Sequence, residues 1–148
     1  MHFPKAFWWA VVSIVLMVVG AFGPWATVLG IVTIHGTDDG RDGWIVVAAA
    51  ALAAVGVGCV VVWRRRWLFI VPIVAGAAGA ATAAYDISDI NSLGPSGTLF
   101  GSDVIDTGWG IYLALAGSIS LVLAAITLWM QARREEAPVA EQPPPLPG

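Results

Sequence analysis

Four long runs of apolar side chains, none interrupted by Lys, Arg, Asp or Glu, constrain this chain more than any other feature. They cover approximately residues 6–26, 44–63, 67–85 and 109–130. Because an α-helix rises about 1.5 Å per residue, about 20 such residues cross the roughly 30 Å hydrocarbon core of a bilayer. With 58% hydrophobic and 11% charged residues, the chain is more apolar than a soluble core of this length can bury. The sequence therefore predicts an all-α membrane protein, a bundle of four transmembrane helices.

The tryptophans fall at or near the ends of these four runs. Indole prefers the headgroup region of a bilayer, because it combines an apolar body with one N–H donor. Besides Trp8 and Trp9 in the first run, we expect six tryptophans to anchor the helices at the two membrane surfaces: Trp25, Trp44, Trp63, Trp67, Trp109 and Trp129.

The charges are divided between the two sides of such a bundle. Six of the seven cations lie on one side: Lys5, Arg64, Arg65, Arg66, Arg133 and Arg134. Seven of the ten acids lie on the other side, together with Arg41: Asp38, Asp39, Asp42, Asp86, Asp89, Asp103 and Asp106. Short basic loops remain in the cytoplasm. We therefore expect a plasma-membrane protein with both termini in the cytoplasm.

The first run has an alternative interpretation as a cleaved secretory signal, because Lys5 precedes an apolar stretch. The run is long, contains Trp8 and Trp9, and lacks a clean small-x-small cleavage site before Pro24. We favour a retained first span, and the other three spans have the same sidedness in either case.

Small residues predict where the helices touch. The third run contains small-xxx-small pairs, which let helix backbones approach closely, and Ala116, Ser120 and Ala124 repeat the pattern in the fourth. We expect a compact left-handed bundle with these contact positions in the third helix: Ala75, Gly76, Gly79, Ala80 and Ala83.

The two outer loops cover about residues 27–43 and 86–108. In the first, the β-branched stretch Thr27–His35 indicates a short strand or a segment lying on the membrane surface. Thr98–Phe100 could supply a partner strand, so a short β-hairpin in the outer loops is expected. Both loops also end in the pattern Gly, hydroxyl residue, Asp, four residues, Gly, Trp. Duplication and independent selection of helix starts explain this repeat equally well.

The chain ends in a proline-rich tail. Residues 133–148 begin with Arg133 and Arg134 and contain five of the nine prolines. This composition predicts a disordered, partly polyproline II cytoplasmic tail. Pro143–Pro147 could dock on an aromatic groove, but a plain solvated end is the stronger interpretation.

The sequence contains no familiar catalytic or cofactor-binding pattern. His2, His35 and Cys59 have no zinc-type spacing, and the chain has neither a Gly-Lys-Ser phosphate loop nor a serine nucleophile elbow. We therefore expect a protein that is not an enzyme and uses no cofactor. Nothing predicts a nucleic-acid partner.

A calcium loop is the nearest approach to a metal site. Residues 38–43 resemble its opening, but Gly40 and Ala49 occupy the third and twelfth positions, where oxygen ligands are needed. A weak cation site could form if the two outer loops fold together. Its candidate ligands are Asp38, Asp42, Asp103 and Asp106. We favour a solvated acidic rim instead.

Transport is disfavoured because no ionisable residue lies inside the four runs. The few hydroxyl side chains there are expected mostly to bond back to helix carbonyls. An oligomeric channel therefore ranks last among the functions considered.

Three segments resemble small four-pass membrane proteins of actinobacteria and their phages: Pro24–Val28, Gly36–Trp44 and Gly108–Gly117. The resemblance covers approximately residues 5–132; it implies the four-pass topology and carries over no catalytic residue. The architecture is also loosely similar to that of claudin-type proteins, although the paired cysteines of their first loop are absent.

Two functions follow as hypotheses. The first is a non-catalytic protein that interacts with another membrane or envelope protein or with itself. The alternative is a phage- or prophage-type membrane effector, which excludes infection or perturbs the membrane potential.

Overall fold

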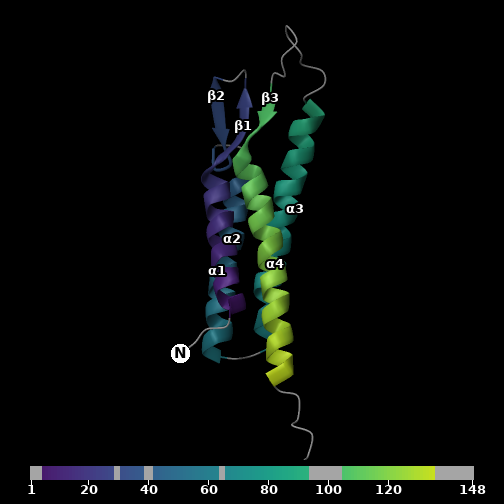
Figure 1. Ribbon diagram of the computed structural model, residues 1–148. Helices are drawn as coiled ribbons and strands as arrows, with labels where there is room; N and C mark the ends of the chain where they lie inside the picture. The colour runs from purple at the N-terminus through teal and green to yellow at the C-terminus, as the bar shows by residue number, and fades with distance from the viewer. Residues whose placement is uncertain (1–4, 29–30, 39–41, 64–65, 94–104, 136–148) are drawn as a thin grey trace, which may run out of the picture.

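A computed structural model describes residues 5–28, 31–38, 42–63, 66–93 and 105–135, in which four helices carry a small sheet at one end (Figure 1). The helices are α1 Lys5–Phe22, α2 Gly43–Trp63, α3 Ile70–Leu93 and α4 Trp109–Glu135, and the 3-10 helix η1 Arg66–Phe69 leads into α3. The strands are β1 Pro24–Val28, β2 Val32–His35 and β3 Ile105–Thr107. The described part of the chain thus has four helices long and apolar enough to cross a membrane, which confirms the coarse fold prediction.

The helix ends differ from the predicted runs. The first run was predicted to reach residue 26, but α1 ends at Phe22 and β1 begins at Pro24. Proline disfavours the helical conformation of the residue before it, here Gly23. Helix α3 continues past residue 85 to Leu93, and α4 continues through the predicted start of the tail to Glu135. Hydropathy shows where a helix becomes polar, and a helix can continue beyond that point. The rest of the predicted tail, residues 136–148, lies outside the described residues.

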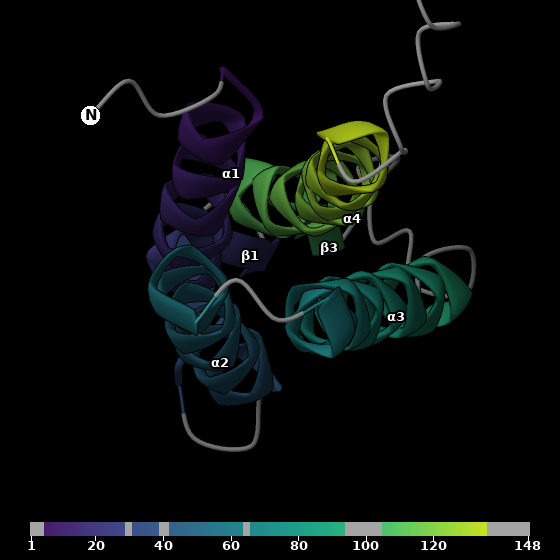
Figure 2. The same ribbon diagram turned by 90° about the horizontal axis from the view of Figure 1, so that it is seen from below.

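The four helices form a ring in which α1 packs on α2 and α4, and α3 packs on the same two helices (Figure 2). Consecutive helices run in opposite directions, as short connections require. The end of the bundle that carries the strands is called the sheet end below. The opposite end, where Lys5 and the last turn of α4 lie, is called the basic end. At 27 residues, or about 40 Å, α4 extends past α1 at the basic end, whereas α3 rises beside the strands (Figure 1).

Small side chains fill the interior, and many large apolar side chains lie outside. Fully buried alanines include Ala10, Ala50, Ala53, Ala114 and Ala124. Exposed apolar residues on the helices include Leu52, Val55, Val62, Ile70 and Val74. This distribution is the reverse of a soluble core and is typical of helices that pack against one another within lipid.

The backbones of helices α1 and α4 approach each other closely. A Cβ added to Gly20 would lie 2.7 Å from Ala114 Cα and 2.8 Å from the carbonyl oxygen of Gly110. One added to Gly117 would lie 2.8 Å from the backbone nitrogen of Met17. These positions therefore accept glycine because the facing backbone occupies the place of a side chain.

Hydroxyl groups inside the bundle are satisfied locally. Ser13 donates to the Trp9 carbonyl at 2.9 Å and Ser118 donates to that of Ala114 at 2.8 Å, as expected for hydroxyls in apolar helices. Trp9 Nε1 also donates to Ser120 Oγ at 2.7 Å, and the Ser13 and Ser120 hydroxyls are 3.0 Å apart. A short polar bridge thus links α1 to α4.

The positions proposed as contacts in the third helix lie on or beside its packed face. Ala75, Gly76, Gly79 and Ala83 are buried, and Ala80 is half-buried. A Cβ on Gly79 would meet Ser118 Oγ at 2.7 Å, and one on Gly76 would meet the Val122 side chain at 2.8 Å. The two glycines therefore contact α4. The handedness of the bundle stays a prediction.

The glycine contact between α1 and α4 generates a test. We expect Gly20→Ala to lower the free energy of unfolding in detergent micelles by about 1–3 kcal/mol, because backbone atoms must move to admit the methyl group. Gly58→Ala is the matched control, since no atom lies within 4 Å of the added Cβ. It should be neutral or stabilising by up to about 1 kcal/mol, because alanine is the better helix former. Equal thermal midpoints for the two variants would contradict the close contact.

Candidate functional site

The sheet end is built on a three-stranded antiparallel sheet in the order β2-β1-β3. In the β1–β2 hairpin, Thr27 pairs with Thr33 and Val28 with Val32, and Ile31 N donates to the Val28 carbonyl at 3.1 Å in the turn. The third strand pairs with β1 through Ala26↔Thr107 and Val28↔Ile105. The sheet therefore joins the first loop to the approach of α4.

A short β-hairpin in the outer loops is confirmed, but its two strands are not the ones that were expected. The β-branched stretch Thr27–His35 is divided between two strands, and the first of them starts at Pro24, within the predicted first span. The strand that joins β1 from the second loop is Ile105–Thr107. The suggested partner Thr98–Phe100 lies outside the described residues.

The prediction that Trp25 anchors the chain at a membrane surface is wrong, because its side chain lies inside the bundle. Its side chain is only 1% exposed, and its Nε1 donates to the Gly20 carbonyl at 2.9 Å. A Cβ on Gly36 would collide with the indole ring. Because the chain turns at Gly23 and Pro24, β1 directs this ring back over the end of α1. Trp25 therefore closes the bundle beneath the sheet, and its N–H satisfies one of the last carbonyls of the helix.

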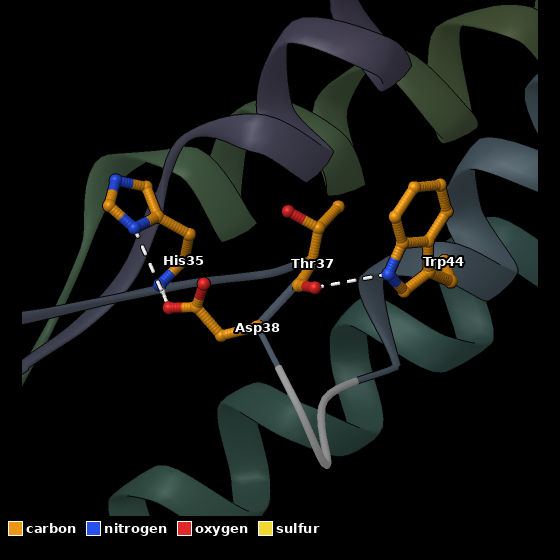
Figure 3. Close-up of polar contacts among 4 residues, drawn as sticks. All are labelled: His35, Thr37, Asp38 and Trp44. Carbon is orange, nitrogen blue, oxygen red and sulfur yellow. Dashed lines mark hydrogen bonds and ion pairs between the residues drawn. The ribbon is translucent and has the colours of Figure 1, made fainter.

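A turn at residues 35–38 follows β2, and Trp44 at the start of α2 is bonded to it (Figure 3). The backbone N–H of His35 donates to Asp38 Oδ2 at 2.7 Å, and the imidazole Nδ1 lies 3.5 Å from the same oxygen. Asp38 N in turn donates to the His35 carbonyl at 3.2 Å. Trp44 Nε1 donates to the Thr37 carbonyl at 3.0 Å, and Gly43 N to that of Gly36 at 2.9 Å. The turn thus fixes the base of the hairpin to the start of α2.

The candidate cation ligands are placed as follows. Asp38 binds the His35 amide, and Asp42 directly precedes α2, where its carbonyl accepts a hydrogen bond from Ile45 N at 2.9 Å. Asp106 belongs to β3, and Asp103 lies outside the described residues. Among the residues that the structure describes, no three His, Cys, Asp or Glu side chains are grouped to hold a metal ion.

One acidic side chain is more buried than the sequence indicates. Asp86 lies within α3 and is 9% exposed, although it was expected at the edge of a span. The position of Asp86 at the end of an apolar run was the one sequence feature that pointed to its burial. The extension of α3 past this residue was not predicted.

The other proposed anchors lie at the two ends of the bundle, as their positions in the helices dictate. Trp44 and Trp109 at the sheet end, and Trp63 and Trp67 at the basic end, are each more than half exposed. Trp129 is half-buried, and the Arg133 guanidinium lies 4.2 Å from the centre of its ring.

The basic end has these cations in the described residues. Arg133 and Arg134 are exposed in the last turn of α4, and Lys5 is exposed at the start of α1. Arg66 begins η1, while Arg64 and Arg65 lie outside the described residues. Cations in a last helical turn also complement the helix dipole.

The tip of the hairpin is an exposed apolar surface. Ile31 is 84% exposed and Val32 is 57% exposed. From Pro24 to Ile34 the sequence has no ionisable side chain. The hairpin stands beyond the ends of α1 and α2, along the direction of the helices (Figure 1). We call Ile31 and Val32 the apolar tip. The sequence indicated that this segment is apolar, but not that these two side chains project from the end of the hairpin.

The burial of Trp25 generates a second test. Trp25→Ala should lower the free energy of unfolding by about 3–5 kcal/mol, because it leaves a cavity beneath the sheet. Trp25→Phe should cost less, since the ring still fills the space. Trp44→Phe is a control that also removes an indole hydrogen bond, but at an exposed position. Thermal melting in detergent checks this order of stabilities. A loss of stability as large for Trp44→Phe as for Trp25→Ala would contradict the role of Trp25 in closing the bundle beneath the sheet.

No protein-family model matches the chain, and neither a curated protein nor a solved structure is significantly similar to it. The resemblance to actinobacterial four-pass proteins accordingly stays a prediction.

Proposed function

We propose that this chain is a non-catalytic, multi-pass plasma-membrane protein that acts by binding another membrane or envelope protein through its sheet end. The four apolar helices and the large apolar side chains on their outer faces support insertion in a bilayer. The cations Lys5, Arg133 and Arg134 at the basic end favour the cytoplasmic side for that end. The sheet end then faces the outside.

The apolar tip is the observation that carries the proposal. The 18 residues of α1 span about 27 Å, close to the thickness of the hydrocarbon core. The five residues of β1 rise about 16 Å further. The tip therefore reaches past the headgroups into water, where exposed apolar side chains are costly by about 25 cal/mol per Å².

A protein partner with an apolar surface removes this cost. Lipid cannot cover a tip at that height, because acyl chains lie below the headgroup region. Contiguous apolar surface in water characteristically marks an interaction site. We therefore assign the binding role to Ile31 and Val32.

Insertion and orientation are tested with reporter fusions. A reporter that is active only outside the cytoplasm should be active after residue 39 and inactive after residue 65, because residue 39 follows Asp38 at the sheet end and residue 65 precedes Arg66 at the basic end. Fusions after residue 135 should behave like those at 65. Extraction of the protein by alkaline carbonate, or activity at residue 65, would contradict the proposal.

Binding is tested with a photo-crosslinking amino acid placed at Ile31 in cells that express the protein. One reproducible adduct is expected, and mass spectrometry then identifies the partner. Leu52, exposed midway along α2, is the control and should not give that adduct. Val32→Asp should reduce the adduct about tenfold, since it places a charge in an apolar contact.

Two results would contradict the binding role. The same adduct from Leu52 would show that capture is not specific to the tip. Rapid loss of membrane potential on controlled expression, unaffected by Val32→Asp, would instead support a membrane effector or a channel.

A further inference from the structure

Strand β2 is an edge strand of the described sheet, because its sheet neighbour is β1 alone. An edge strand presents unpaired N–H and C=O groups, to which strands of other molecules can add. Proteins commonly protect such edges with Lys, Pro or bulges. The sequence of β2, Val32-Thr-Ile-His35, contains neither Lys nor Pro.

The direction of each backbone group in β2 follows from the hairpin. Gly36 N donates across the hairpin to the Gly23 carbonyl at 3.4 Å. Hydrogen-bonding direction alternates along an antiparallel strand. Ile34 and Val32 therefore direct their backbone groups toward β1, as Gly36 does, whereas Thr33 and His35 direct theirs outward.

The outward groups of His35 are both engaged by Asp38. The N–H of His35 donates to Asp38 Oδ2 at 2.7 Å, and its carbonyl accepts from Asp38 N at 3.2 Å. Beyond the other end of β2, the N–H of Ile31 is engaged by the Val28 carbonyl at 3.1 Å. Thr33 is the remaining outward position of the strand.

We propose that Asp38 is an edge cap, which prevents other strands from adding to β2. A strand that approached Thr33 would gain hydrogen bonds at one residue only, which does not offset the freedom lost on association. Loss of the Asp38 carboxylate would free the His35 N–H, so that two alternate N–H groups, those of Thr33 and His35, could donate to an added strand. The cap does not depend on the proposed function, because it protects the edge of β2 regardless of which molecule binds the apolar tip.

The unmodified protein provides the first test, by hydrogen exchange of backbone amides. The His35 amide should exchange at least about tenfold more slowly than the Thr33 amide, although both point outward, because Asp38 holds the former. Asp38→Ala should abolish this difference while the amides of α2 keep their protection. Asp38→Asn is the matched control, because its side-chain oxygen can accept the same hydrogen bond. Equal exchange at the two amides of the unmodified protein would overturn the proposal.

The second test measures strand addition itself, between two copies in detergent micelles. Copies in micelles can meet head to head, as antiparallel pairing requires. Thr33→Cys with Cys59→Ser places the two residues at position 33 opposite each other in such a pair. Asp38→Ala in this background should raise disulfide-linked dimer about fivefold or more, since it frees the His35 N–H to pair with the added strand.

Two controls separate the cap from other effects of the Asp38 side chain. Asp38→Asn and His35→Ala should leave dimer formation within about twofold of the background, because both keep the acceptor for the residue 35 amide. An equal rise in dimer with Asp38→Asn would show that the effect comes from the charge of the side chain. The absence of a rise with Asp38→Ala would show that the edge stays closed without the cap. Either result would overturn the proposal.

Discussion

The close backbone contact between α1 and α4 is the interaction on which the rest of the structure depends. Because Gly20 and Gly110 remove side chains from this contact, the end of α1 lies directly beside the start of α4. The segments that leave these two points, β1 and β3, are then near enough to pair. Gly108 N donates to the Trp25 carbonyl at 2.8 Å at the same junction. The pairing of β3 with β1 is thus a consequence of helix packing, although the two strands lie about 80 residues apart in the sequence.

The same contact explains why Trp25 lies inside the bundle. With the backbones of α1 and α4 close together, the chain that follows Gly23 must turn over the end of the bundle. The side chain of Trp25 then fills the space above the last turn of α1, where helix carbonyls need donors. A large indole therefore closes an interior otherwise filled mainly by alanine and glycine, and it supports the hairpin from below.

The sequence predicted the elements that depend on composition and missed those that depend on neighbours. Apolar runs located all four helices, because a long run without charge has few alternatives to a spanning helix. The β-branched residues after Thr27 indicated a strand for a similar local reason, but not that the stretch is divided between two strands of a hairpin. The burial of Trp25 was not predictable from its position near a run end, since it depends on contacts with Gly20 and Gly36. Asp38 was a candidate cation ligand because it lies among other acidic residues of the outer loops. Its bond to the His35 amide was missed, since that bond requires a turn whose geometry the residue pattern does not specify.

The two features of the sheet end restrict how another molecule can be recognised there. A partner that added a strand to β2 would be held by backbone hydrogen bonds, which carry little information about side chains. With His35 engaged by Asp38, that mode has only Thr33 available. Recognition then depends on the side chains of Ile31 and Val32, which require a complementary apolar surface on the partner. The cap and the apolar tip therefore act together at this side of the sheet, because closing the edge of β2 disfavours indiscriminate strand pairing there and leaves the side-chain contact that distinguishes one partner from another.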